Sequence, residues 1–176
     1  PRPYWLCAGR VAVEKNIEAF LKLDLPGTKI IAGDGPARES MQRKYSEAIW
    51  LGYKFGEELA KIYADSDVFV FPSKTDTFGN VLLESIASGT PVAAFPVPGP
   101  QDVLKPGVDG VLSENLKDAR LSALRLDRNV VHRSSMDWDW DTYFQTFLSH
   151  LVPFDSDKFS YQFNKFESPT ILPTSD

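Results

Sequence analysis

One stretch of the chain, residues 67–95, constrains the fold more than any other. It starts with the short apolar run DVFVF and ends with the short apolar run PVAAF, which are both typical of buried strands. Between these runs, Gly79 opens and Gly89 closes a segment whose apolar residues recur at helical spacing. Two buried strands joined by a helix form a βαβ unit, whose strands are parallel. The stretch therefore predicts an α/β fold built around a parallel sheet.

Polar residues gather in the loop SKTDTFGN, directly after the first of these strands. In open α/β sheets, ligands bind at the carboxyl ends of the strands, beside the starts of helices. Gly79 lets the backbone approach a ligand closely, and the free N–H groups of a helix start suit a phosphate or sugar oxygen. Asp76 lies in the loop and Glu84 in the helix, so both carboxylates could reach one crevice. Taken alone, this pair is better explained by a helix cap at Asp76 and a solvated Glu84.

The residues around the two acids resemble a known signature. The run S-x-x-D-x-F-G-N-x-L-L-E-S-x-A-S-G-T-P-V is similar to the acid-x7-Glu motif of retaining GT-B glycosyltransferases, the group 1 glycosyltransferases. The resemblance implies that Asp76 meets the donor sugar, that the backbone after Phe78 meets the sugar and phosphates, and that Glu84 holds the ribose. The matching positions are Asp76, Phe78, Gly79, Asn80 and Glu84, and Val81, between them, is a further candidate for contact with the substrate. The first acid is most often Glu in this family, and the shorter Asp76 could alter sugar choice or weaken the contact.

A second match follows the first predicted strand, YWLCA. Gly9 would allow a tight exit from this strand, and Arg10 and Lys15 bracket the loop that follows. Arginine supplies a planar fork and lysine a mobile point charge, which together could grip a diphosphate, although most Arg and Lys pairs are simply solvated. The sequence G-R-V-A-V-E-K resembles the family motif G-R-x-x-x-x-K, whose two cations hold the donor pyrophosphate. The resemblance assigns that role to Arg10 and Lys15.

Two further loops lie where the family places its nucleotide. Gly33, Asp34 and Gly35 follow the strand TKIIA, and a structural turn explains them most simply. In the resembling family this turn packs against the nucleotide. Tyr53 and Lys54 follow the strand IWL, in the loop that meets the base in the family, although an aromatic residue lying on the surface explains Tyr53 equally well.

Composition excludes several other functions. The 176-residue chain is 43% hydrophobic and 24% charged, which is typical of a globular domain with one core. Its net charge of −5 argues against a general binder of nucleic acids or anionic membranes. Cys7 lies inside an apolar strand and is interpreted as a buried structural thiol. His132 and His150 lack metal-ligand spacing, and neither a P-loop nor a hydrolase nucleophile motif occurs, so no metal and no cofactor is expected.

The expected fold is a Rossmann-like, three-layer α/β domain over residues 1–151 with about six parallel strands, equivalent to the C-terminal half of a GT-B enzyme. Residues 152–176 mix Ser, Asp, Pro and scattered Phe and are expected to form an irregular tail. The resemblance implies retaining transfer of a hexose from a nucleotide diphosphate sugar, GDP-mannose or a UDP-hexose, to a hydroxyl of a glycolipid or glycan. The acceptor would bind a missing N-terminal domain, so this chain alone is expected to bind donor without turnover.

Two other classes of protein stay open. A GT-B-shaped epimerase is disfavoured by the paired motifs, whereas a non-catalytic nucleotide-sugar-binding or docking module would fit if Asp76 cannot replace the usual Glu. No apolar run approaches the roughly 20 residues that span a bilayer, so a cytoplasmic location is expected. Peripheral contact of the full-length protein with the inner membrane face is left open.

Overall fold

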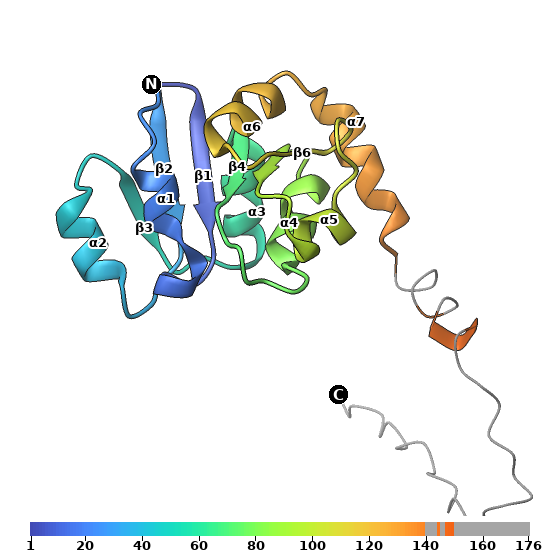
Figure 1. The fold of residues 1–176 in the computed structure, drawn as a ribbon, viewed down its shortest axis with the longest axis horizontal. Helices are drawn as coiled ribbons and strands as arrows, with labels where there is room; N and C mark the ends of the chain where they lie inside the picture. Colours follow the sequence, from blue (N-terminus) through green and yellow to red (C-terminus); the bar gives the residue numbers. More distant parts are fainter. Residues whose placement is uncertain (140–143, 145–146, 150–176) are drawn as a thin grey trace, which may run out of the picture. The chain divides into compact units, whose positions relative to one another are not determined.

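The apolar runs identified in the sequence form the strands of one parallel sheet (Figure 1). In the computed structural model, which describes residues 1–139, 144 and 147–149, the strand order is β3-β2-β1-β4-β5-β6. The strand bounds are β1 (Tyr4–Ala8), β2 (Thr28–Ala32), β3 (Ile49–Gly52), β4 (Val68–Phe71), β5 (Val92–Ala94) and β6 (Gly110–Leu112). The expected parallel sheet of about six strands is confirmed.

The strand order reverses beside β1. The chain moves outward from β1 through β2 to β3, and then crosses to the other side of β1 to form β4, β5 and β6 (Figure 1). β1 and β4 pair in register through two residue pairs, Trp5 with Val68 and Leu6 with Phe69. The connections that leave the carboxyl ends of these two strands run to opposite faces of the sheet. A crevice opens between them, which is where α/β proteins of this type bind ligands.

Helices cover both faces of the sheet and complete the three layers. Their bounds are α1 (Ile17–Leu21), α2 (Arg38–Lys44), α3 (Gly56–Asp65), α4 (Asn80–Ala87), α5 (Pro98–Val103), α6 (Leu116–Ala123) and α7 (Arg128–Ser134), with short 3-10 turns at η1 (Val13–Lys15) and η2 (Ser135–Asp137). One core lies under α1, α2 and α6, and the other under α3, α4, α5 and α7. The three-layer, Rossmann-like architecture expected from the sequence is confirmed.

Strand β1 shows how the sequence builds the two cores. Trp5 and Cys7 pack into the core under α1 and α6, whereas Leu6 and Ala8 pack into the opposite core. Because side chains alternate between the faces of a strand, a strand buried on both faces must be apolar at every position. Cys7 is buried, as expected, and its burial raises the pKa of the thiol to about 12. The thiol is therefore protonated and structural at neutral pH.

The central βαβ unit agrees with the prediction at both ends of its helix. Gly79 has a φ of 81° and takes the position before α4, a left-handed conformation that suits glycine. Gly89, with a φ of 70°, follows the helix, and its N–H donates to the carbonyl of Ile86 at 2.9 Å. The loop before α4 is therefore fixed at the carboxyl end of β4.

The described residues beyond residue 139 belong to a second unit, Trp140–Asp176, in which residues 144 and 147–149 are helical. The expected domain end at residue 151 and the irregular tail at 152–176 lie outside the described residues and stay predictions. Within the described ranges, no helix is both long enough and apolar enough to cross a membrane.

Candidate functional site

Two loops meet at the point where the strand order reverses. One follows β1 and carries Arg10 and Lys15, and the other follows β4 and carries Asp76. Hydrogen bonds join the loops: the side-chain amide of Asn16 donates to the Pro72 carbonyl at 3.0 Å, and the Thr75 hydroxyl donates to the Glu14 carbonyl at 3.4 Å. The sequence motifs that match one family are thereby brought together from positions about 60 residues apart.

The centre of the junction is an ion pair between the Lys15 ammonium and Oδ1 of Asp76. The two side chains are 30% and 19% exposed, so the pair is partly shielded from solvent. Burial alone would raise the pKa of Asp76, but hydrogen bonds from Lys15 and Ser73 outweigh it and hold that pKa below its ordinary value. Asp76 is therefore ionised at neutral pH. Its other oxygen, Oδ2, is buried and has no hydrogen-bond partner in the described part of the chain.

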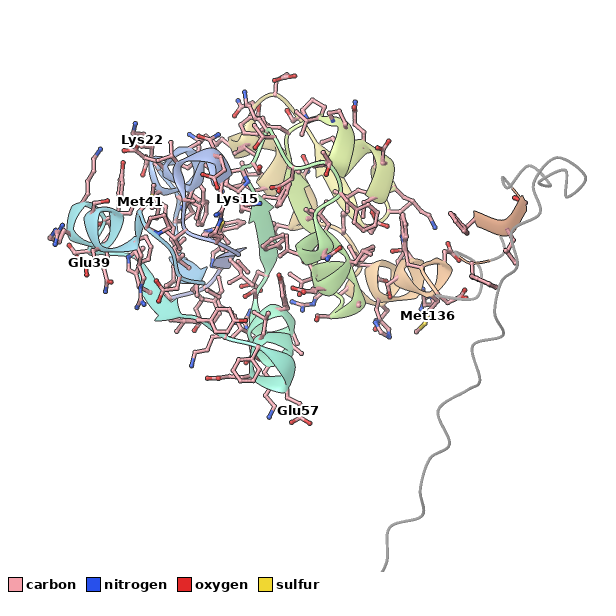
Figure 2. All side chains as sticks on the ribbon, turned by 90° about the horizontal axis from the view of Figure 1, so that it is seen from below. Lys15, Lys22, Glu39, Met41, Glu57 and Met136 are labelled. Atoms are coloured by element: carbon pink, nitrogen blue, oxygen red, sulfur yellow. The ribbon has the colours of Figure 1, made fainter. Side chains whose placement is uncertain are left out.

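A cavity of about 250 Å³ lies against this ion pair. Arg10 and Lys15 line it from the β1 side, and Pro72 and Ser73 line it from the β4 side. Figure 2 shows Lys15 lying between the first part of the chain, in blue, and the green strand β4. Arg10 lines the same cavity and forms an exposed ion pair with Glu14, four residues on. Two cations therefore border one cavity, each neutralised by a carboxylate of the chain itself.

The start of α4 also faces this cavity, through Val81. Among the residues that the structure describes, no side chain caps the N-terminus of α4. The first N–H groups of a helix lack partners within the helix and carry partial positive charge, so they suit an anionic ligand. The arrangement at this end of the site, two cations and an uncapped helix start, favours a phosphate group.

A second cleft, of about 530 Å³, continues from the first because Gly9, Arg10 and Val81 line both. Its far end is lined by residues that follow β2 and β3, and by the first residues of α3 and α4: Gly33, Asp34, Tyr53, Lys54, Phe55, Leu59 and Glu84. The two cavities form one extended site, in which Lys15 lines only the smaller cavity and Tyr53, Phe55 and Glu84 line only the larger. This shape and polarity suit a nucleotide with its phosphates at the Lys15 end.

Glu84 is oriented by a buried tyrosine. The Tyr63 hydroxyl donates a hydrogen bond to Oε2 of Glu84 at 3.1 Å, and Tyr63 is only 1% exposed. Burial, and then the neighbouring Glu84 carboxylate, raise the pKa of Tyr63, so its hydroxyl keeps the proton that it donates. Glu84 thus presents its carboxylate to the cleft in a fixed orientation. The position of Tyr63 on the apolar face of α3 indicates a core residue, and the sequence gives no sign of this contact.

The turn after β2 is fixed by close backbone packing. A Cβ at Gly33 would lie 2.9 Å from the carbonyl carbon of Gly9 and closer still to its oxygen. The Asp34 carboxylate accepts hydrogen bonds from the Gly35 N–H at 2.7 Å and from Arg38 at 2.8 Å, and these bonds lower its pKa. The turn is therefore both a structural device, as its residues alone suggested, and part of the wall of the cleft.

Phe55 joins Tyr53 at the mouth of the cleft, although sequence reasoning did not select it. The two rings are 72% and 71% exposed for Tyr53 and Phe55, and their centroids lie 5.9 Å apart. The signal that could have found Phe55 is its spacing, since residues i and i+2 of an extended segment lie on the same side. Lys54, between them, pairs with Glu58.

The remaining motif residues lie around the cavities. Phe78 contacts Trp138, with ring centroids 5.9 Å apart at 76°. Within the described part of the chain, neither cavity is lined by the side chains or backbone of Gly35, Asp76, Phe78, Gly79 or Asn80. Asp76 is connected to the site by its ion pair with Lys15, which lines the smaller cavity. Gly79 lies directly before α4, whose Val81 lines both cavities. Among the described residues, no group of three His, Cys, Asp or Glu side chains could hold a metal ion.

The fold and the site together define a Rossmann-like α/β domain with a cleft at the switch point of its parallel sheet. Comparison with known families is more specific. The family described as "Glycosyl transferases group 1" matches residues 2–126, and the chain belongs to this family.

Two curated relatives illustrate the family. The chain is 39% identical over 106 residues to a GDP-mannose-dependent alpha-mannosyltransferase of Mycobacterium tuberculosis, covering 59% of this chain and 28% of the relative. It is 36% identical over 114 residues to the sulfoquinovosyl transferase SQD2 of Arabidopsis thaliana, covering 62% of this chain and 22% of the relative. The chain thus spans less than a third of the length of these relatives.

Solved structures show the same fold at lower identity. The pneumococcal O-GlcNAc transferase GtfA, in complex with UDP and GlcNAc, is 22% identical with a TM-score of 0.67, covering 84% of this chain and 35% of that chain. The lipopolysaccharide outer core galactosyltransferase WaaB is 20% identical with a TM-score of 0.68, covering 84% of this chain and 48% of that chain. The resemblance to a GT-B glycosyltransferase domain, expected from the motifs, is confirmed.

Proposed function

We propose that this chain is the donor-binding half of a glycosyltransferase. The full enzyme would move a hexose from a nucleotide diphosphate sugar, GDP-mannose or a UDP-hexose, to a hydroxyl of a glycolipid or glycan, with retention of anomeric configuration. The observation that carries the proposal is the continuity of the two cavities: Lys15 lines one, Glu84 lines the other, and Arg10 lines both. The names of the relatives support this class of donor, because several are described as GDP-mannose-dependent.

Each end of the site has a separate task in this proposal. At the wide end, the exposed rings of Tyr53 and Phe55 offer flat surfaces on which a base can stack, and Glu84 accepts hydrogen bonds from the ribose hydroxyls. At the narrow end, Arg10 and Lys15 meet the diphosphate and Asp76 accepts hydrogen bonds from the hexose hydroxyls. Arg10 and Lys15 exchange their present carboxylate partners, wholly or in part, for phosphate oxygens.

The chemistry of such a transfer depends on the leaving group. When the bond between the sugar and the diphosphate breaks, its electron pair stays on the phosphate oxygen, where negative charge develops. Arg10, Lys15 and the uncapped start of α4 are preorganised donors for that charge. We propose that these groups supply the needed positive charge without a metal ion. Nucleotide affinity should then be unchanged by excess EDTA, and a loss of binding that added Mg²⁺ restores would contradict this.

The expected affinity of the isolated chain is modest. Charge-assisted hydrogen bonds contribute about 1.5–3 kcal/mol each, so four of them give roughly 6–12 kcal/mol before costs. Loss of translational and rotational freedom costs at least about 4 kcal/mol. Roughly 2–8 kcal/mol then remains at most, and we expect a dissociation constant in the high-micromolar to millimolar range, since 1 mM corresponds to about −4 kcal/mol.

Calorimetric titration with UDP, GDP and ADP tests the proposal. We expect one nucleotide to bind the chain, and the double variant Arg10→Ala, Lys15→Ala to lose that binding. The matched control is Lys22→Ala with Arg43→Ala, which removes two exposed cations that line neither cavity. Equal loss in the control, or binding that survives the double variant, would overturn the assignment of the diphosphate site. Absence of binding at millimolar concentration, by this chain and by the full-length protein, would overturn the function.

A further inference from the structure

Asp34 and Glu84 are the carboxylates that line the larger cavity within the described part of the chain. Glu84 is bonded to a buried tyrosine and is assigned to the ribose. Asp34 lines the cavity from the turn after β2, and the exposed rings of Tyr53 and Phe55 line the same cavity from the loop after β3. The Asp34 side chain is 52% exposed, so a ligand in the cavity can reach its oxygen atoms. Asp34 is therefore the carboxylate at the end of the site where the base would stack.

The Asp34 carboxylate is held in one position. It accepts hydrogen bonds from the Gly35 N–H at 2.7 Å and from Arg38 at 2.8 Å, and these bonds lower its pKa. Arg38 lies against the end of β3, because a Cβ at Gly52 would be 3.4 Å from both terminal nitrogens of its guanidinium. The Gly33 N–H donates to the Gly52 carbonyl at 2.7 Å and ties the turn to the same strand. Asp34 is therefore a positioned anion beside the loop that follows β3.

The edges of the bases differ in how they meet such a group. An ionised carboxylate accepts hydrogen bonds and donates none. Guanine carries two adjacent donors on one edge, N1–H and the N2 amino group, which match the two oxygens of a carboxylate. Uracil carries one N3–H between two carbonyl oxygens, and adenine carries a ring-nitrogen acceptor beside its amino group. A carboxylate therefore repels part of the edge of uracil or adenine, whereas it can bond to both donors of guanine.

We propose that Asp34 selects guanine as the base of the donor, so that the nucleotide sugar is a GDP-sugar rather than a UDP-sugar. This inference rests on the proposed function. Contact of one side chain with two groups of a base edge changes relative affinity by about tenfold, or about 1.4 kcal/mol. Arg38 lines neither cavity in the described part of the chain and acts through Asp34, so it is a positioning residue.

Calorimetric titration of the wild-type protein and of Asp34→Asn with GDP, UDP and inosine diphosphate tests the inference. Inosine diphosphate is GDP without the N2 amino group, so comparison of the two isolates the second donor. We expect the wild type to bind GDP about tenfold more tightly than UDP and about fivefold more tightly than inosine diphosphate.

The variant Asp34→Asn keeps an oxygen that can accept from the Gly35 N–H, but it has no charge and presents an amide donor. It should bind GDP about tenfold more weakly than the wild type does, and UDP within about twofold of the wild type. Its affinities for GDP and inosine diphosphate should agree within about twofold. The control is Glu39→Gln, which changes an exposed acid of α2 that lines neither cavity (Figure 2) and should alter none of these affinities.

A role for Asp34 in the turn alone gives a different pattern. In that case Asp34→Asn will weaken all three ligands by similar factors, and a GDP to UDP ratio that changes by less than about threefold overturns the inference. Tighter binding of UDP than of GDP by the wild type, or equal binding of GDP and inosine diphosphate, overturns the inference and leaves the proposed function standing.

Folding of the variants is followed by circular dichroism. If Asp34→Asn does not fold, Asp34→Ser takes its place, because the serine hydroxyl can also accept from the Gly35 N–H. Absence of binding of all three nucleotides, by this chain and by the full-length protein, overturns the proposed function and this inference with it.

Discussion

Substitution of Gly33 by alanine should destabilise the protein far more than the same change at Gly9. The two glycines have similar backbone conformations, with φ of 151° and 133°, so alanine is strained at both. A Cβ at Gly33 would press on the backbone of Gly9, whereas a Cβ at Gly9 would meet nothing within 4 Å. The pair therefore separates the cost of packing from the cost of conformation.

The expected magnitudes follow from these two costs. Conformational strain of this kind costs about 1–3 kcal/mol and applies to both variants. Overpacking adds about 1–3 kcal/mol to Gly33→Ala, because the opposing atoms belong to a backbone that cannot rotate away. Gly33→Ala should thus lower the free energy of unfolding by about 2 kcal/mol more than Gly9→Ala does.

Urea unfolding, followed by tryptophan fluorescence, measures this difference. Trp5, in β1, is fully buried in the core under α1 and α6 and should report loss of that core. The urea dependence of the free energy must be the same in both variants for the comparison to hold. If the free energies of unfolding of Gly33→Ala and Gly9→Ala agree within about 0.5 kcal/mol, the close approach of the Gly33 turn to the loop after β1 does not add to the cost of alanine at position 33.

Three further predictions test particular contacts. Tyr63→Phe removes the hydroxyl that orients Glu84, so the affinity for the nucleotide should fall about three- to tenfold, or about 0.6–1.4 kcal/mol. Calorimetry should show unchanged binding of the 2′,3′-dideoxy nucleotide, which lacks the ribose hydroxyls, and an equal loss for both ligands would contradict the ribose role. Folding lowers the pKa of Asp76, so the stability that this residue contributes is present above its ordinary pKa of about 4 and is lost as pH falls below that value. The free energy of unfolding should therefore fall less steeply with decreasing pH in Asp76→Asn than in the wild type. An unchanged pH profile would refute the lowered pKa. The buried Arg120 guanidinium lies 4.9 Å from the ring centroid of Trp5, and its Nε and Nη1 have no partner among the described residues. Arg120→Met should therefore raise the free energy of unfolding, measured in urea, by about 1–2 kcal/mol. A decrease of that free energy by more than about 1 kcal/mol would contradict this prediction.

The fold could be predicted from the sequence because its signals are local. Each strand is a short apolar run, and each run is followed by a segment of helical spacing, so the parallel sheet follows from the order of elements. The glycines that bound α4 have left-handed conformations that their identity predicts. Helix α7 is not predicted, because its short sequence RNVVHRS lacks a clear apolar period; the Asp127 carboxylate that caps it at 2.8 Å is visible only in the structure.

The candidate site is predictable only in part. Motif spacing selects Lys15 and Asp76, but their ion pair joins residues 61 positions apart and depends on where the strand order reverses. Apolar periodicity places Tyr63 in the core, and its ring is indeed buried. The periodicity does not predict the hydrogen bond that its hydroxyl donates to Glu84. Contacts made by the polar end of an otherwise buried side chain leave no periodic signal in the sequence.

The pairing of β1 with β4 joins two halves of the sheet. The strands on one side, β1 to β3, come from residues 4–52, and those on the other, β4 to β6, come from residues 68–112, so each half is continuous in the chain. A ligand in the two cavities touches both halves, since the loops after β1 and β4 line the same space. A nucleotide at 100 times its dissociation constant would add about 2.7 kcal/mol to the stability of the folded state. Bound donor would therefore stabilise the contact between two halves of the domain that are each continuous in the sequence.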